Sequence, residues 1–390
     1  MTTRRFSLLV ILGLLSGVLV FGIVKTIRLA RVPSFESAWA ARLKWDDSVS
    51  EQVIAASLHD PTFRDQRLIL EAGVLSRQGQ AADAVKKLKR LDPAWRERPE
   101  ARYVRGETFY SLGALREAEE QFLSLVREDP SHSGVHLWLG VIYYDQMQFD
   151  RFFREMERTI RLAPDDFRPH RLMGLMYHRV DRFSESAHHF QEALRLGGIS
   201  DQEDIVGHLA QALLFNRDYS GVVELISKVP DPSGDLWAML GEAHLNLGSG
   251  DEAVNNCVEQ GLKAGPHARR VLQFASQIYI DSGRSEEAII FLNELLMTAP
   301  HYQGAHFLLS RAYLKLGRQG DYELAIKRLK AADEIKKEHG DLMQRILKNP
   351  NDAEALKRAE MLSVEMGEPG LAKMYSVARD SVSSSGGPNR

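Results

Sequence analysis

The chain has 390 residues, of which 44% are hydrophobic and 26% are charged, and its 50 basic and 53 acidic residues leave a formal net charge of −3. This composition excludes a globally disordered chain, and the charge balance excludes the strong basic excess of a dedicated nucleic-acid binder. The single cysteine, Cys257, excludes an internal disulfide, a CxxC redox pair and a multi-cysteine zinc site.

The first predicted element is an apolar segment near the N-terminus. Residues 6–24 read FSLLVILGLLSGVLVFGIV and contain no charged side chain. As a helix this segment would span about 28 Å, close to the thickness of the hydrocarbon core of a bilayer. A cleaved signal peptide has a shorter apolar core with a small-x-small cleavage site directly after it, whereas Lys25 and Arg28 follow here. We therefore predict an uncleaved, single-pass transmembrane anchor at 6–24.

The orientation of this anchor is nearly balanced. Arg4 and Arg5 precede it, and Lys25, Arg28 and Arg31 follow it, so the excess of positive charge that marks the cytoplasmic side is small. A short Arg-Arg head before a long apolar run is typical of an export signal anchor. We therefore expect the body on the extracytoplasmic (periplasmic) side, and the cytoplasmic side remains the alternative.

Helical lead-in residues are expected between the anchor and the main body. Phe35, Trp39 and Leu43 are spaced at i, i+4 and i+8, which places them on one face of a helix. These side chains either lie at the membrane interface or cover the first element of the body, and we favour the second arrangement.

The body of the chain has an internal period of 34 residues. Prolines close several of the periodic segments, and a small residue lets two helices approach closely. A single helix pair cannot bury its apolar face alone, so successive pairs are expected to stack. The recurring small residues are Ala72, Gly106, Gly140 and Gly174, followed with looser spacing by Ala210, Gly241, Ser276 and Ser310.

This pattern resembles the tetratricopeptide repeat (TPR) family, whose repeat reads W-x2-L-G-x2-Y…A-x3-F…A…P. The best copies are 99–132, 133–166 and 167–200; the first of them contains Gly106, Ala118 and Phe122. The resemblance implies an all-α fold, a right-handed superhelical solenoid of antiparallel helix pairs. We expect about three extra residues in the inter-helix turn of the copy that begins at Gln303.

The expected organisation follows the chain in order. It comprises a tail at 1–5, the anchor at 6–24, a juxtamembrane helical lead-in at 25–64, an array of about eight repeats at 65–339 with a degenerate copy at 203–232, a spacer helix and C-terminal TPR-like unit at 340–380, and a disordered tail at 381–390.

The chain carries no recognisable catalytic motif: it has no GxxxxGK loop, HExxH pair or GxSxG elbow, and no GxGxxG that follows a predicted strand. His188 and Glu192 share a helix face and could hold a metal, but a solvated face is the simpler interpretation. Cys257 is expected to be a small buried hydrophobe. We expect no enzymatic activity, no cofactor and no metal. The histidines in the tryptophan slot of the family are expected to be packing residues: His136, His170 and His306.

The family resemblance implies a peptide-binding groove lined by the first helix of each pair. Tyr110, Tyr144 and His178 occupy one slot at 34-residue spacing and would form a strip of anchors with polar edges. The alternative is that the tyrosines pack between repeats. The groove residues expected from the three best copies are Tyr103, Glu107, Tyr110, Leu137, Val141, Tyr144, Asp145, Arg171, Leu175, His178 and Arg179.

The predicted function is that of a non-catalytic scaffold or adaptor, tethered to a membrane through 6–24, which binds partner proteins or peptides in its groove. Glu107, Asp145, Arg171 and Arg179 would set the register of the bound peptide. The alternatives are an assembly factor for an envelope complex (pilus, secretion or c-type cytochrome biogenesis), the regulatory subunit of an enzyme, and a homo-oligomer formed by stacking of the array ends. No nucleic-acid partner is expected.

Overall fold

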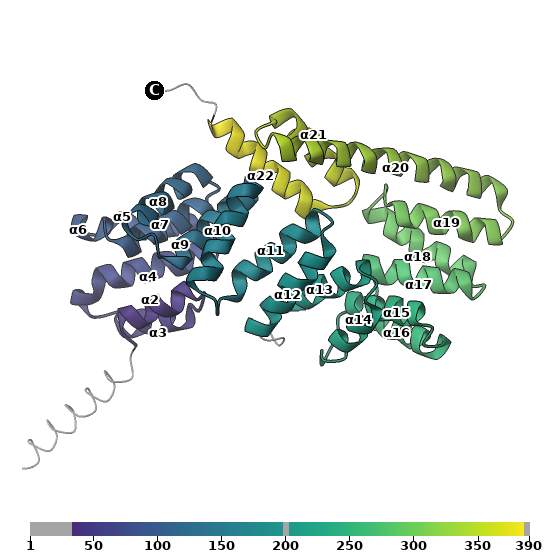
Figure 1. The fold of residues 1–390 in the computed structure, drawn as a ribbon, viewed down its shortest axis with the longest axis horizontal. Coiled ribbons are helices and arrows are strands. Elements are labelled where there is room, and N and C mark those ends of the chain that lie inside the picture. The colour runs from purple at the N-terminus through teal and green to yellow at the C-terminus, as the bar shows by residue number, and fades with distance from the viewer. Residues whose placement is uncertain (1–32, 198–202, 386–390) are drawn as a thin grey trace, which may run out of the picture. The chain divides into compact units, whose positions relative to one another are not determined.

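The computed structural model describes residues 33–197 and 203–385, which form helices joined by turns (Figure 1). The all-α fold of paired helices is therefore confirmed. The predicted anchor at 6–24 lies outside the described residues, and no helix inside them is both long and apolar enough to cross a membrane. The chain divides into two compact units, 1–135 and 136–390.

Unit 1 begins with the lead-in hairpin. Ser34 caps its first helix by accepting a hydrogen bond from the Ser37 backbone N–H at 3.2 Å. Phe35 is buried and, with Trp39, packs against the core of the first repeat, so these aromatics cover that repeat as expected. The helices of this unit are α2 (Phe35–Leu43), α3 (Ser48–Ala56), the 3₁₀ helix η1 (Pro61–Phe63), α4 (Arg64–Arg77), α5 (Ala81–Lys89), α6 (Pro93–Arg96), α7 (Pro99–Ser111) and α8 (Leu115–Glu128).

The periodic small residues permit close contact within each helix pair. A Cβ atom added to Gly106 of α7 would lie 2.7 Å from Cζ of Phe122 on α8, which is too close without a shift. A Cβ added to Gly174 would lie 2.8 Å from Cδ1 of Phe190 in the same way. In both pairs the glycine therefore lies where one helix packs against an aromatic ring of the other.

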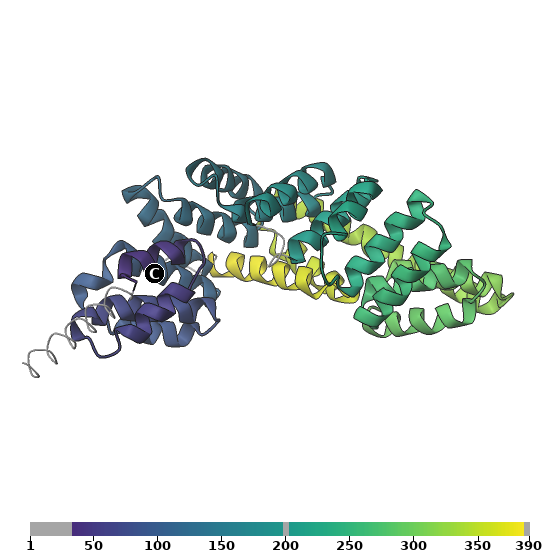
Figure 2. The ribbon, with the colours of Figure 1, turned by 90° about the horizontal axis from the view of Figure 1, so that it is seen from below.

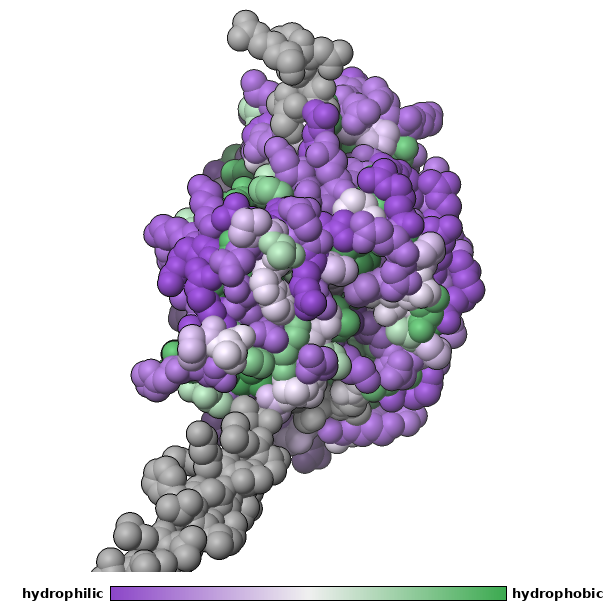
Figure 3. Space-filling view, turned by 90° about the vertical axis from the view of Figure 1, so that its left-hand side faces the viewer, coloured by the Kyte–Doolittle hydropathy of each residue, from purple (hydrophilic) through white to green (hydrophobic). Residues whose placement is uncertain are grey.

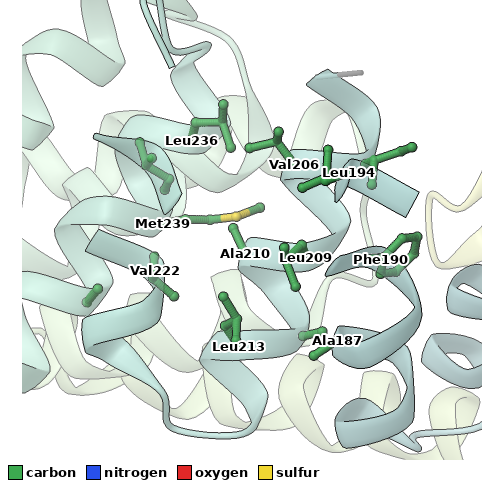
Figure 4. Close-up of a cluster of buried hydrophobic side chains, with 14 of the residues drawn as sticks. Ala187, Phe190, Leu194, Val206, Leu209, Ala210, Leu213, Val222, Leu236 and Met239 are labelled. Atoms are coloured by element: carbon green, nitrogen blue, oxygen red, sulfur yellow. The ribbon is translucent and has the colours of Figure 1, made fainter. Parts of the chain in front are cut away.

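Unit 2 continues the same architecture, including the copy predicted to be degenerate. Its core joins α12 to α15 and contains Val206, Leu209 and Val222 from that copy (Figure 4). Residues 203–232 thus form a helix pair although their sequence departs from the family pattern. The helices of the array in this unit are α9 (Ser133–Asp145), α10 (Phe149–Leu162), α11 (Phe167–Arg179), α12 (Phe183–Gly197), α13 (Glu203–Phe215), α14 (Tyr219–Ile226), α15 (Gly234–Leu247), α16 (Asp251–Ala264), α17 (Arg269–Asp281), α18 (Ser285–Thr298) and α19 (Gln303–Lys315).

The C-terminal part differs from the sequence prediction in two respects. The turn after α19 is short, with Gly317 at φ 69°, and the extra length lies in α20 (Gln319–Lys348), so the prediction of an extended turn was wrong. The predicted spacer is the last part of this same continuous helix. The final pair is α21 (Ala353–Glu365) and α22 (Pro369–Ser385), so the prediction of a disordered tail was wrong for 381–385.

The final pair, called here the C-terminal hairpin, has its own apolar core. Leu342 and Ile346 at the end of α20 pack with Leu356 of α21 and Tyr375 of α22. Val382 packs against the same core, which explains why α22 continues past residue 380. Figure 2 shows α22 in yellow, returning along the helices of unit 2.

Candidate partner-binding surface

The predicted groove residues of unit 1 are largely buried. Tyr103 has an exposed fraction of 1% and Glu107 of 2%. Tyr103 packs edge-on against Trp39 of the lead-in and against Phe122, with ring centroids 5.5 and 5.6 Å apart. The assignment of these two residues to an open groove is therefore wrong, because the lead-in hairpin covers that part of α7.

Glu107 belongs to a buried ionic cluster rather than to a binding surface. Its carboxylate forms ion pairs with Arg42, which is fully buried, and with Arg77 at 3.0 Å. Asp47 completes the cluster, 2.6 Å from Arg42 and 3.3 Å from Arg77. Burial disfavours the charge on Arg42, but the Glu107 and Asp47 carboxylates outweigh it and raise its pKa. Arg42 crosses α4 at Gly73, where a Cβ would lie 2.6 Å from its Nη2 atom.

Tyr110, the residue of the predicted strip that belongs to unit 1, is half-buried. On the face shown in Figure 3, hydrophilic residues predominate and hydrophobic residues appear in small patches. In unit 2, Leu137 is buried, with an exposed fraction of 2%, while Val141 and Asp145 are half-buried. Leu137 is thus a core residue, and its assignment to an open groove is also wrong.

Tyr144 and Arg179 are brought together, and α22 lies against them. The Tyr144 hydroxyl accepts a hydrogen bond from Arg179 Nη2 at 3.0 Å, and the Tyr144 ring packs against Phe152. Arg179 Nη1 lies 2.7 Å from the Sδ atom of Met374 on α22. This part of the predicted surface is therefore occupied by the chain itself.

The predicted residues of α11 have separate surroundings. His178 packs edge-on against Phe183 at 5.3 Å, and burial lowers its pKa to about 4, so its imidazole is neutral at pH 7. Leu175 packs against the core of α12 to α15. Arg171 forms an exposed ion pair with Asp204, with Nε 2.9 Å from the carboxylate. Tyr144 and His178 therefore take part in different clusters.

Sequence reasoning missed two exposed apolar residues of α19. Phe307 precedes Ser310 by three positions and Leu314 follows it by four, as Tyr103 and Tyr110 do around Gly106. Their exposed fractions are 50% and 59%. The prediction was confined to the three best copies; the same spacing applied to this later copy identifies both residues.

The histidines predicted to be packing residues are buried or half-buried. His136 is buried and lies 2.6 Å from a Glu155 carboxylate oxygen, and His306 lies 2.8 Å from the carbonyl oxygen of Pro300, as expected of packing residues. His170 and His189 lie 3.1 Å apart, between their Nδ1 atoms. Within the part of the chain that the structure describes, no group of three or more His, Cys, Asp or Glu side chains could hold a metal ion.

Cys257 is buried, as its sequence position predicts. Burial raises the pKa of its thiol to about 11. The thiol is therefore protonated at physiological pH, which disfavours nucleophilic chemistry.

Comparison with solved structures finds matches at low identity. A chain of the APC/C hetero-tetramer Cut9-Hcn1 is 16% identical, with a TM-score of 0.48; the match covers 71% of this chain but only 54% of that one. The human IFIT1 dimer with m7Gppp-AAAA is 15% identical, with a TM-score of 0.41 and coverage of 89% and 88%. PilF of Pseudomonas aeruginosa is 13% identical, with a TM-score of 0.44 and coverage of 53% and 94%. These values are too low to carry over a partner or an activity.

Comparison with family models is more direct. Tetratricopeptide repeat models match residues 70–133, 112–167 and 270–302. No curated protein sequence matches the chain significantly. Tetratricopeptide repeats typically mediate protein–protein interactions and are typically non-catalytic. The matched segments fall on the helix pairs described above, and residues 70–167 and 270–302 therefore consist of tetratricopeptide repeats.

Proposed function

We propose that this chain is a non-catalytic scaffold, tethered to a membrane by residues 6–24, which binds partner proteins or peptides through first-helix residues of its repeats. The main support for this binding surface is the exposure of Phe307 and Leu314 on α19. These residues are seven positions apart and so share one face of the helix.

The chemistry of this surface favours a partner segment with apolar side chains. Arg311 lies between Phe307 and Leu314 in the sequence and is held by Asp281 at 2.6 Å, with about a third of its side chain exposed. Burial of an apolar partner side chain against Phe307 and Leu314 would supply affinity, and the Arg311–Asp281 pair beside them would set orientation. If both apolar residues are anchors, their joint removal weakens partner binding by about 2–4 kcal/mol.

The test is a cross-linked pull-down from native membranes with a matched control. The double variant Phe307→Ser plus Leu314→Ser removes the proposed anchors. The control, Ile290→Ser plus Met297→Ser, removes two residues of α18 that are also seven positions apart and are 65% and 83% exposed. We expect a partner that is lost with the α19 variant and retained with the α18 variant; an equal effect of both would refute this surface.

The membrane tether is proposed from the uncharged segment at 6–24, and the extracytoplasmic side from its Arg-Arg head. Deletion of 6–24 should release the body into the soluble fraction. A Met297→Cys variant offers an exposed thiol, while Cys257 stays silent because it is buried. Labelling of the variant by a membrane-impermeant maleimide in spheroplasts, without lysis, is the expected result; labelling only after lysis would place the body in the cytoplasm.

A further inference from the structure

The C-terminal hairpin makes a contact within unit 2 that repeat stacking does not require. Met147, in the turn between α9 and α10, is fully buried in the core of the hairpin together with Met374 and Tyr375. Tyr144 and Phe149 pack against the same core. Figures 1 and 2 both show α22 beside the helices that carry these residues.

The backbone at Met147 indicates that its side chain has a specific role. Met147 has φ 58°, in the left-handed region that L side chains rarely adopt. The equivalent turns after α7 and α17 use Gly113 and Gly283, which take this conformation without strain. Non-glycine residues at φ near 60° also occur at Asp181 and Arg217, but those side chains are exposed. Met147 differs from these residues because its side chain is fully buried against another element of the fold.

Besides its packing on α20, the hairpin makes two further contacts with unit 2, one partly solvated and one weak. At its turn, Arg269 of α17 pairs with Glu368 at 2.5 Å and donates to the carbonyl oxygen of Gly367 at 2.7 Å. The two charged side chains are 38% and 48% exposed, so this ion pair is weakened by solvent. At the other end, Arg179 reaches the thioether of Met374, which is a weak acceptor.

The hairpin also shows which chemistry the underlying surface accepts. We define the seat as Tyr144, Met147, Phe149 and Arg179. The stripe of α22 that faces the apolar core follows helical spacing and consists of Leu371, Met374, Tyr375, Ala378 and Val382. The seat therefore fits an amphipathic helix with aliphatic, methionine and tyrosine side chains on one face.

We propose that the C-terminal hairpin is a displaceable strap, and that the seat beneath it binds an amphipathic helix of a partner protein with an apolar stripe like that of α22. The proposal rests on the proposed function, since it assumes protein partners, but it uses a different surface from Phe307 and Leu314. A partner helix would replace α22 on the seat. Because α22 competes for the same seat, the apparent affinity of the partner helix would be lower than its affinity for an open seat.

The test uses the full-length chain in mild detergent and a fluorescent peptide with the sequence of residues 369–385. We expect weak binding to the wild-type chain, because α22 occupies the seat. Met374→Lys should loosen the strap, because it places a second positive charge beside Arg179, and should strengthen peptide binding at least tenfold. Adding Met147→Gly to that variant should abolish the gain, whereas adding Asp181→Gly, which changes an exposed residue at the equivalent turn position, should preserve it.

Amide hydrogen exchange decides the remaining outcomes. In the Met374→Lys variant, faster exchange in α22 with unchanged exchange in α9 to α11 would show that the strap is released and the seat intact. Released α22 without a gain in peptide binding would overturn the proposal, and so would a gain that survives Met147→Gly. A pull-down partner that depends on Phe307 and Leu314, found together with a released α22 that gives no gain in peptide binding, would leave the scaffold function standing while the strap proposal fails.

Discussion

The buried ionic cluster of unit 1 supports a quantitative prediction for Glu107→Ala. Arg42 is fully buried, and it would keep only Asp47, at 2.6 Å, as a charged partner. Removal of one partner from a buried ion pair costs about 3–5 kcal/mol, because it leaves an uncompensated charge. Since Asp47 remains, we expect the lower end, about 3 kcal/mol. For a unit of about 100 described residues, that loss lowers Tm by roughly 12–24 °C.

The assay is thermal unfolding of the full chain in mild detergent, followed by circular dichroism, with amide exchange to locate the change. Exchange should rise first in α2 and α3, which Arg42 and Asp47 tie to α7 through Glu107. Replacement of both buried charges, Arg42→Met plus Glu107→Met, should restore most of the lost stability, because no buried charge is left without its partner. Glu128→Ala serves as the control, because its ion pair with Arg102 lies at an exposed carboxylate and should contribute little.

Two results would refute this reasoning. A Glu107→Ala chain that unfolds within about 1 kcal/mol of the wild type would show that the cluster contributes no more than a surface pair. A double methionine variant as unstable as the single variant would show that shape, rather than charge, holds α2 against α7.

Three further predictions concern other sites. Gly106→Ala should lower the free energy of unfolding by about 1–3 kcal/mol, because its Cβ would meet the Phe122 ring at 2.7 Å. The control is Gly320→Ala, which has no atom within 4 Å of its added Cβ and should not destabilise α20. Chemical denaturation of the two variants measures the difference. Burial holds the pKa of His178 at about 4, below its ordinary 6.5, so the stability it contributes is present above pH 6.5 and is lost as the pH falls toward 4. We expect His178 alone to account for about 1–2 kcal/mol of the stability lost between pH 7 and pH 5, and His178→Phe to reduce the loss by that amount in pH-dependent melts. The pKa of the Cys257 thiol is raised to about 11, so the thiol should react with iodoacetamide at pH 8 only as fast as the chain opens. An alkylation rate that does not increase with denaturant concentration would contradict its burial.

The helix pairs could be predicted from the sequence because the signals that define them are local. Gly106 and Phe122 are 16 positions apart, within one pair, and their contact repeats in the next copies with the same spacing. Pro99 begins α7, and Pro130 is the second residue after the end of α8. Even residues 203–232 fold as a pair, since their neighbours supply apolar surface that compensates for a weak pattern.

The candidate surface was harder to predict because distant segments decide what is exposed. Glu107 is buried by Arg42, 65 positions away, and no spacing rule links a lead-in arginine to a groove position. Arg179 meets Met374, 195 positions away, because the last helices return to an earlier part of the array. One signal was present in the sequence: Met147 stands where several other turns have glycine.

The length of α20 sets the angular position of everything that follows it. Ala325 packs in the core of α17 to α19, and Leu342 packs in the core of the C-terminal hairpin. These residues are 17 positions apart on one continuous helix, a separation of about 25 Å. One residue inserted between them would rotate the hairpin by about 100° about the helix axis and turn its apolar stripe away from Met147. Seven inserted residues would restore the angle to within about 20°, but would move the hairpin about 10 Å along the axis. The length of α20 thus sets both the distance and the angle between the core of α17 to α19 and the C-terminal hairpin. Insertions or deletions in its polar middle would disrupt the contact of the hairpin with Met147 without altering either core.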